Sequence, residues 1–405
     1  MLSFEDARQT ILSNVNCMEA EAVEILDALG RVIAEDVIAP IDLPSFDNSA
    51  MDGYAVRVSD CNRFAPLIVS GYIPAGGTAV ATEVLPGNAI RIMTGAPVPS
   101  GCDAIVPLED VEEVQEAGKE IWVVKTAPRS GQHIRRAGED VKRGETVLPA
   151  GALIRVPAVS VLASLGRTQV QVYRKPVVAI LATGDELVEP GQALPEGKLY
   201  NSNSVALAAA VREAGAEAII LGIARDDREH LRPMIASGLT ADVLITAAGV
   251  SVGDRDFVRD VLEELGVIQL FWKVDMKPGK SMAFGTCGGK PVFSLPGNPV
   301  SAMITFEEMV RPALLKMMGH RKVVKSLVTA TLQEEMRKKS GRVFFSRVRL
   351  ERVNDKLLAW NAGNQETGFV QTLLHADALA VLPADRVSFS AGEEIDVHLL
   401  SSLLE

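Results

Sequence analysis

The stretch Val177-Val-Ala-Ile-Leu-Ala-Thr-Gly-Asp-Glu-Leu187 decides the fold of the central part of the chain. Its unbroken apolar run, Val177–Leu181, is typical of a strand that is buried on both faces of a helix-covered parallel sheet. The turn Thr183-Gly184-Asp185-Glu186 then follows the carboxyl end of that strand. Open parallel sheets bind ligands at that end, so the stretch predicts both an α/β fold and one edge of a binding site.

Strand and helix patterns alternate from here to about residue 319. Further strands are expected over Ala218–Ile223, Val243–Thr246, Val267–Val274, Met282–Phe284 and Val292–Leu295. Helices are expected over Asn201–Glu213, after Asp226-Asp227, over Phe257–Leu265, and from Pro299 or Val300 onward. This series of βαβ units predicts a three-layer α/β domain with a mainly parallel sheet.

The flanking regions have different patterns. Ser3 and Asp6 form a capping-box pattern at the start of a first helix, and a second helix is predicted over Ala20–Leu29. From residue 31 to about 173, short β-type runs between proline and glycine turns predict a β-rich region. Past Lys322 the pattern is again β, which predicts a small, barrel-like C-terminal domain. We therefore expect four parts: residues 1–42 with 141–173, an inserted β-rich domain over 43–140, the α/β domain over 174–322, and a β domain over 323–405.

Composition excludes several classes of function. The formal net charge of −11 over 405 residues argues against general nucleic-acid binding, which needs a basic face. The four cysteines are scattered without a CxxC pair, so neither a disulfide framework nor a zinc cluster is expected. No apolar run approaches the ~20 residues of a membrane span, and no signal peptide is evident. We expect a cytoplasmic protein that binds neither nucleic acid nor membrane.

Four glycine-rich or proline-rich loops are expected at the carboxyl edge of the sheet, over residues 182–187, 246–256, 277–280 and 296–299. Glycines let backbone N–H groups approach phosphate oxygens. Four acids lie on the same loops: Asp185, Glu186, Asp254 and Asp256. Phosphates and carboxylates share a site most easily around a divalent cation. The loops therefore predict a phosphorylated, nucleotide-like ligand with Mg²⁺, and Lys277 and Lys280 predict a second anion-binding element.

Each motif alone also has an ordinary structural explanation. Thr-Gly-Asp-Glu fits a turn that opens an acidic helix, and Lys-Pro-Gly-Lys fits a hairpin turn with exposed lysines. Their clustering at strand ends favours a site. The N-terminal half adds Asp52, Thr94 and Asp140, each within a stretch of small or charged residues, whereas Arg135 and Arg136 also fit a solvated surface pair.

Taken together and in order, these segments resemble the molybdopterin molybdenumtransferase family, which includes MoeA and the gephyrin E domain. The matching stretches are Phe46–Ala55, Met93–Pro99, Gly138–Val141, Ala182–Leu187, Asn201–Ser204, Gly249–Asp254, Met276–Lys280 and Leu295–Pro299.

The resemblance implies a homodimer of four-domain subunits, in which residues 1–42 and 141–173 form a linker and dimerisation domain. It implies insertion of molybdate into adenylylated molybdopterin with Mg²⁺-dependent release of AMP. It also implies a cleft between the α/β domain of one subunit and the Asp52-bearing domain of the other. A molybdopterin adenylyltransferase is a possible docking partner.

The resemblance also implies roles for individual residues. The catalytic set is Asp52, Asp140, Glu186, Asp226 and Asp256. The Mg²⁺ ligands are Glu186, Asp226, Asp254 and Asp256. The substrate-binding set is Thr94, Thr183, Gly184, Ser251, Gly253, Lys277, Lys280, Pro296, Gly297, Asn298, Pro299, Ser301, Arg347 and Thr367.

The sequence departs from the family at Ala248, where the family usually has glycine, and over the C-terminal segments that contain Arg347 and Thr367. Two other hypotheses stay open on the residues alone: an adenylyltransferase that makes adenylylated molybdopterin, and a non-catalytic molybdopterin-binding scaffold. Molybdate and tungstate have the same shape and charge, so the residues do not choose between them.

Overall fold

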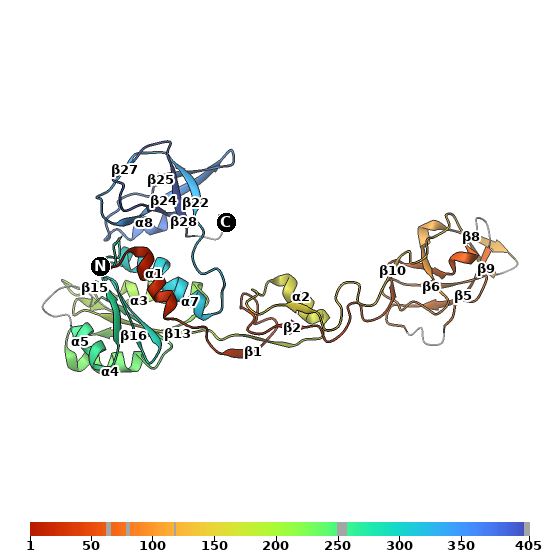
Figure 1. The fold of residues 1–405 in the computed structure, drawn as a ribbon, viewed down its shortest axis with the longest axis horizontal. Helices are drawn as coiled ribbons and strands as arrows, with labels where there is room; N and C mark the ends of the chain where they lie inside the picture. Colours follow the sequence, from red (N-terminus) through yellow and green to blue (C-terminus); the bar gives the residue numbers. More distant parts are fainter. Residues whose placement is uncertain (62–65, 78–81, 117–118, 249–256, 401–405) are drawn as a thin grey trace. The chain divides into compact units, whose positions relative to one another are not determined.

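A computed structural model describes residues 1–61, 66–77, 82–116, 119–248 and 257–400. The chain divides into two compact units, Met1–Glu21 with Gln171–Glu405, and Ala22–Val170 (Figure 1). It crosses between them within β1 (Ala20–Glu24) and again within β12 (Gln169–Tyr173).

A six-stranded sheet forms the centre of the first unit, in the order β16-β13-β17-β21-β20-β18. The strands are β13 (Val177–Thr183), β16 (Glu217–Ala224), β17 (Val243–Ala247), β18 (Ile268–Trp272), β20 (Ala283–Cys287) and β21 (Lys290–Leu295). The first four in spatial order are parallel, whereas β20 and β18 run antiparallel to their neighbours. The mainly parallel sheet is thus confirmed. The antiparallel end follows from the Gly288-Gly289 turn between β20 and β21, which is too short for a crossover.

Helices cover both faces of this sheet, so the three-layer architecture is confirmed (Figure 1). One face packs against α4 (Arg228–Gly238) and α5 (Phe257–Glu264). The other packs against α1, α3 (Ser202–Glu213), α6 (Pro299–Thr305) and α7 (Arg311–Met317), with a π-helical turn at Phe306–Val310 between the last two. Side chains cap two of these helices: the Asn201 side chain accepts from Ser204 N–H, and that of Asp227 from His230 N–H.

The first helix, α1 (Phe4–Ser13), belongs to this unit. The Ser3 hydroxyl caps it at Asp6 N–H, as the sequence predicts. Its buried face, which includes Phe4 and Ile11, joins the core of the α/β domain, and the Phe4 ring lies 4.9 Å from that of Phe345. Because the apolar stripe of α1 is buried in this core, residues 1–21 group with 171–405. The predicted division places them with the N-terminal domain instead.

Two secondary-structure predictions for the N-terminal half are wrong. The helix predicted over Ala20–Leu29 is the strand β1 followed by a turn. Ile25 N–H donates to Thr168 C=O (3.0 Å), so a long-range hydrogen bond replaces a helical one. Within the region predicted to be β, α2 (Val156–Ser164) is a helix. Its β-branched residues favour a strand, yet Pro157 sits in the first turn, where a helix tolerates proline.

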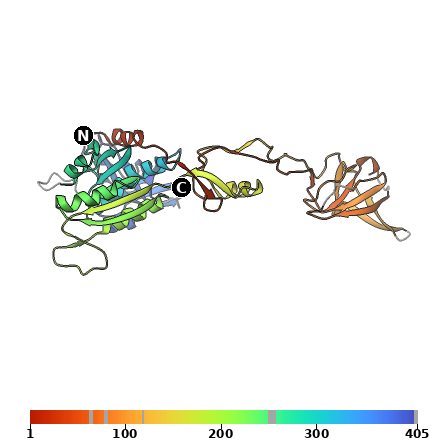
Figure 2. The same cartoon turned by 90° about the horizontal axis from the view of Figure 1, so that it is seen from below.

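The second unit contains the predicted β-rich domain, visible in both orientations (Figures 1 and 2). Its six-stranded sheet has the order β7-β4-β6-β5-β9-β8. The strands are β4 (Gly53–Val56), β5 (Pro66–Ile73), β6 (Asn88–Ile92), β7 (Ala104–Pro107), β8 (Val111–Glu116) and β9 (Lys119–Val124). Shorter elements complete the unit: β2 (Val37–Ile38), β3 (Asn48–Ser49), β10 (Ile134–Arg135), β11 (Thr146–Leu148), and the 3-10 turns η1 (Val58–Asp60) and η2 (Leu108–Asp110).

The C-terminal domain is a closed barrel. It consists of β22 (Val328–Leu332), β24 (Val343–Val353), β25 (Lys356–Asn361), β26 (Ala378–Leu382) and β28 (Glu394–Leu399). The ring closes because β24 pairs with both β25 and β26, so the barrel-like prediction is confirmed. The short strand β19 (Met276–Lys277), from the α/β domain, pairs with β24. Other short elements are β14 (Leu187–Val188), β15 (Leu199–Tyr200), β23 (Met336–Arg337), β27 (Ser388–Phe389) and α8 (Gln371–Leu374).

In the part of the chain that the structure describes, no helix is both long and apolar enough to cross a membrane.

Candidate active site

A cavity of about 740 Å³ lies at the carboxyl ends of the parallel strands; we call it the strand-end cavity. Loops that follow three different strands line it. Of the residues selected from the sequence, it contains Glu186 after β13 and the run Pro296–Pro299 after β21. Ala248, after β17, completes the edge, and Gly368 of the C-terminal barrel also lines it. Three of the four loops expected at this edge therefore contribute residues to one cavity, whereas the loop over residues 277–280 does not.

The turn after β13 depends on glycine at position 184. Gly184 has a φ of 142°, and its N–H donates to Ala224 C=O (3.2 Å). The carboxylate of Glu186 folds back over the Cα of Gly184, so a side chain at position 184 would displace it. Glu186 itself is exposed, and Thr183 is buried beneath the turn. The turn therefore presents one carboxylate at the mouth of the strand-end cavity.

A pair of acids, Asp185 and Asp226, joins the ends of β13 and β16. Asp185 N–H donates to the Asp226 carboxylate (3.4 Å), and Asp226 N–H donates to the Asp185 carboxylate (3.3 Å). The Lys198 ammonium donates to the backbone carbonyl of Asp185. Asp226 is thus held by Asp185, and the two carboxylates stand close together beside Gly184.

The described residues do not themselves bring three or more His, Cys, Asp or Glu side chains together around a metal-sized space. Four further predicted residues, Ser251, Gly253, Asp254 and Asp256, lie outside the described residues. The predicted Mg²⁺ set is therefore described only at Glu186 and Asp226.

Ala248 marks the end of β17 with an unusual backbone. Its φ is +81°, a left-handed conformation that suits glycine and disfavours a Cβ atom. The Ala248 Cβ also faces Gly297, where a second Cβ would lie only 3.1 Å away. A glycine would adopt this backbone without strain, and the alanine present here adds a Cβ atom to the wall of the strand-end cavity.

The turn after β21 is fixed from the start of α3. Asn203 Nδ2 donates to Gly297 C=O (2.7 Å). Asn298 occupies the N-cap position of α6, but its side chain makes no capping hydrogen bond. Pro299 is the first residue of α6, and Ser301 is buried within its first turn. The Asn298 amide is therefore not used as a cap.

The lysine loop joins the α/β domain to the barrel. Lys277 is exposed, with its Nζ 5.3 Å from the centroid of the Phe344 ring, while Lys280 is half-buried. Gly279, at φ +110°, lies directly over the hydroxyl of Thr305, which is buried and finds no partner among the described residues. A Cβ at position 279 would meet that hydroxyl, so glycine lets the loop rest on α6.

Lys277 lines a second cavity of about 560 Å³, which we call the lysine cavity. The barrel supplies the rest of its wall, including Thr367, Lys338 and Ser346. Gly368 lines both this cavity and the strand-end cavity, so the two are adjacent. Lys280, in contrast, lines neither of them among the described residues.

Arg347 lies behind the lysine cavity and is fully buried. Its guanidinium donates to the carbonyls of Asn364 (3.0 Å) and Glu366 (3.4 Å) and to the Gln365 side chain (3.3 Å). Burial lowers the pKa of Arg347. These contacts hold the turn that presents Thr367, so Arg347 shapes the cavity from behind its wall.

Three predicted residues belong to the second unit. Asp52 Oδ1 accepts two hydrogen bonds from Thr94, from its N–H and from its hydroxyl, each 2.7 Å long. The backbone N–H of Thr94, followed by its hydroxyl, holds the pKa of Asp52 below its ordinary value. Asp140 is exposed. Arg136, which also fits a solvated pair, forms an ion pair with Asp47.

The sequence reasoning gave no role to several residues that line the cavities: Asn203, Ser281, Lys338, Ser346 and Gly368. Asn203 lies within Asn201–Ser204, one of the stretches that resemble the family, so the sequence offers a reason to include it in the site. Lys338, Ser346 and Gly368 come from barrel segments in which no residue pattern distinguishes a cavity wall from the rest of the surface.

Three family models match the chain in order. The MoeA N-terminal region (domain I and II) matches residues 2–166, the probable molybdopterin binding domain matches 179–316, and the MoeA C-terminal region (domain IV) matches 329–400. Together with the cavities, these matches define the class: a multidomain protein built around a molybdopterin-binding domain.

Relatives cover the whole chain. It is 38% identical to the molybdopterin molybdenumtransferase of Haemophilus influenzae, over 100% of both chains. It is 36% identical to molybdopterin molybdenumtransferase 2 of Mycobacterium tuberculosis, over 98% of this chain and 99% of the relative. The crystal structure of the molybdopterin biosynthesis MoeA protein of Pyrococcus horikosii aligns with a TM-score of 0.86 at 32% identity, over 99% of this chain and 100% of that chain. The chain belongs to the molybdopterin molybdenumtransferase family and is an enzyme of molybdenum cofactor biosynthesis.

Proposed function

We propose that this protein inserts molybdate into adenylylated molybdopterin, with Mg²⁺-dependent release of AMP. The observation that carries the proposal is the pair of adjacent cavities that meet at Gly368. One is rimmed by Glu186 and by glycine turns, and the other contains Lys277 and Thr367. Such a pair suits a substrate whose phosphate end and metal-accepting end react next to each other.

The strand-end cavity would hold the adenylyl and phosphate part of the substrate. The turns at Gly184 and Gly297 present backbone groups that a phosphate oxygen can approach closely. Glu186 and Asp226, with Asp254 and Asp256, would hold the Mg²⁺, which supplies charge neutralisation for the phosphoanhydride. Hydrolysis of that anhydride consumes one water and yields AMP and the pterin phosphate. The carboxylates of this rim would orient that water and accept its proton.

The lysine cavity would hold molybdate, a tetrahedral dianion. Lys277 and Thr367 line this cavity, and their ammonium and hydroxyl groups would bind the dianion. Lys280 and Ser301 would support the loop and the start of α6 next to it. Tungstate would enter the same cavity, because it has the same charge and shape.

Asp52, Thr94 and Asp140 would complete the site from a second copy of the chain. This part of the proposal follows the family's dimeric arrangement, and with it we propose a cytoplasmic homodimer. The adenylylated substrate would come from a molybdopterin adenylyltransferase, which would dock only while it passes that substrate on.

A reconstitution tests the proposal. Purified protein receives adenylylated molybdopterin, MgCl₂ and molybdate without ATP, and AMP and active cofactor are quantified. We expect both products to form. If neither product forms, and the protein instead adenylylates molybdopterin in a second assay that contains ATP, it is an adenylyltransferase. If the substrate binds without turnover, it is a scaffold. Either result would overturn the proposal.

A further inference from the structure

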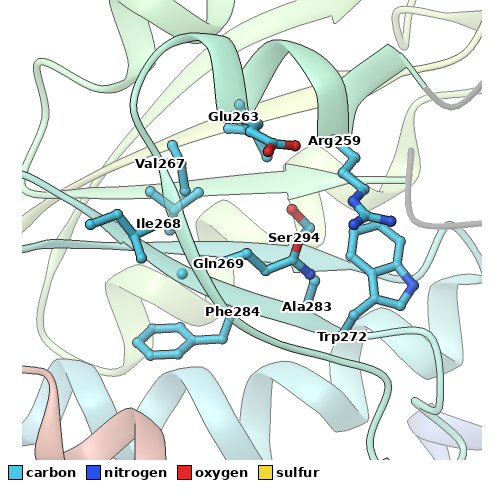
Figure 3. Close-up of a pocket in the computed structure, with 12 residues that line it drawn as sticks. Arg259, Glu263, Val267, Ile268, Gln269, Trp272, Ala283, Phe284 and Ser294 are labelled. Atoms are coloured by element: carbon cyan, nitrogen blue, oxygen red, sulfur yellow. The ribbon is translucent and has the colours of Figure 1, made fainter.

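A third cavity, of about 370 Å³, lies at the β18 edge of the central sheet, where α5 covers the hairpin β20–β21 (Figure 3). Its volume falls in the range of roughly 300–1,000 Å³ usual for small-molecule sites. None of its lining residues lines either of the cavities described above. Strand β21 connects it to the site, since Ser294 lines this cavity and Pro296 lines the strand-end cavity.

A buried hydroxyl faces this third cavity. Ser294 is only 3% exposed as a residue, and its hydroxyl opens onto the cavity without a hydrogen bond to another described residue. Figure 3 shows it in the middle of the cavity, between Glu263 and Gln269. Its neighbour in register on β17, Thr246, also has a buried hydroxyl without a partner among the described residues. Because no described residue binds the Ser294 hydroxyl, it is free to exchange a hydrogen bond with a ligand atom in the cavity.

One wall of the third cavity is aromatic and cationic. The Arg259 guanidinium lies 5.3 Å from the centroid of the Trp272 ring. Glu263 follows Arg259 by one helical turn on α5, so a carboxylate and a guanidinium approach the same space. Apolar side chains make up most of the remaining wall: Leu262, Val267, Ile268 and Val292. The cavity therefore combines a ring face, one acid, one cation and a buried hydroxyl.

We propose that the third cavity binds a fused 2-amino-4-oxopyrimidine ring with an anionic substituent, the ring that guanine nucleotides and pterins share. The adjacent ring N–H and amino group of such a ligand donate together to one carboxylate, here Glu263. Ser294 bonds a ring heteroatom, and Arg259, which lies over the Trp272 ring, pairs with the phosphate or carboxylate. Adenine does not offer this pair of adjacent donors. The site is separate from the proposed reaction and does not depend on it.

Isothermal titration calorimetry on the full-length protein tests this proposal with three probes: GMP, pterin-6-carboxylate and AMP. Glu263→Gln removes the double acceptor, and Ser294→Ala removes the hydroxyl. The matched control is Glu264→Gln, because Glu264 pairs with Arg228 (2.6 Å) outside the cavity. Thermal melts show whether each variant folds.

We expect GMP, pterin-6-carboxylate or both to lose about tenfold in affinity in Glu263→Gln, and Ser294→Ala to weaken the same probes. Glu264→Gln should leave affinity unchanged, and AMP should not respond to Glu263→Gln. A loss confined to one of the two ring probes identifies the source, nucleotide or pterin. The proposal is overturned if neither ring probe responds to Glu263→Gln, or if AMP responds equally.

Discussion

The strand-end cavity and the lysine cavity share Gly368 but differ in charge and in origin. The first is built from turns that follow parallel strands, and it carries acids on its rim. The second is formed where one loop of the α/β domain meets the barrel, and it carries three cations, Lys277, Arg337 and Lys338, beside the acids Glu335 and Glu366. This difference supports the proposed division of one substrate between the two cavities, with the part that needs a divalent cation in the first and an oxyanion bound by ammonium and hydroxyl groups in the second.

The largest expected effect is on the acidic side. Glu186→Gln keeps the size of the side chain but removes its charge, so kcat for AMP release should fall by about 10²- to 10³-fold. The Km for molybdate should stay within about twofold, because Glu186 does not line the lysine cavity. Steady-state kinetics with varied molybdate measure both constants. Glu196→Gln, on the exposed loop before Lys198, is the matched control and should behave as wild type.

The next effect is on the lysine side. Lys277→Ala should raise the Km for molybdate by about ten- to thirtyfold, since one charge-assisted contact to the dianion is lost. The kcat at saturating molybdate should change far less. Lys322→Ala, at an exposed position outside both cavities, serves as the control. If Lys277→Ala lowered kcat and left Km unchanged, the two cavities would not divide the substrate as described.

A smaller effect concerns the wall between the strand-end loops. Ala248→Gly relieves a left-handed backbone that costs an L-residue roughly 1–2 kcal/mol, less the entropy that glycine loses on folding. The free energy of unfolding of the α/β part should rise by about 0.5–1 kcal/mol, and Tm by about 1–3 °C. Differential scanning calorimetry measures this. A drop in Tm would show that the Ala248 backbone is not strained. The control is Ala247→Gly, within β17, which should lower the Tm.

The smallest effect lies outside both cavities. Thr94→Val removes the hydroxyl that bonds Asp52 but keeps the backbone N–H, which is the larger cause of the lowered pKa. The pKa of Asp52 should therefore rise only part of the way towards its ordinary value. Because Asp52 would then take up a proton at a higher pH, the acidic limb of the kcat profile should move to higher pH. Activity at pH 7 should stay within about twofold of wild type. If the acidic limb of the kcat profile did not move, Asp52 would not be a group whose ionisation controls the reaction.

The sequence predicts the fold best where one period dominates. The buried run that became β13 and the capped helices α3 and α4 match their predicted positions, because their patterns and caps agree. Prediction fails at β1 and α2, where local preference and long-range pairing oppose each other. The sequence also does not predict that β20 runs antiparallel to its neighbours, because an apolar run does not show the direction of its strand.

The candidate site shows the same limit. Glu186, the Pro296–Pro299 turn and Lys277 are recognisable because they lie in short motifs at strand ends. The inward orientation of Arg347 and the position of Gly368 between the cavities depend on how the barrel closes. That closure joins β24 to β26 over a long separation in sequence, so no local pattern reveals it.

The most direct test of the central claim is a single-turnover assay with adenylylated molybdopterin, MgCl₂ and molybdate in the absence of ATP. AMP and molybdenum-loaded cofactor are counted for the wild type, Glu186→Gln and Lys277→Ala. We predict equal amounts of AMP and cofactor in the wild type, neither product in Glu186→Gln on the same time scale, and recovery of both in Lys277→Ala when molybdate is raised. Cofactor formed without release of AMP, or full turnover in both variants, would contradict the account.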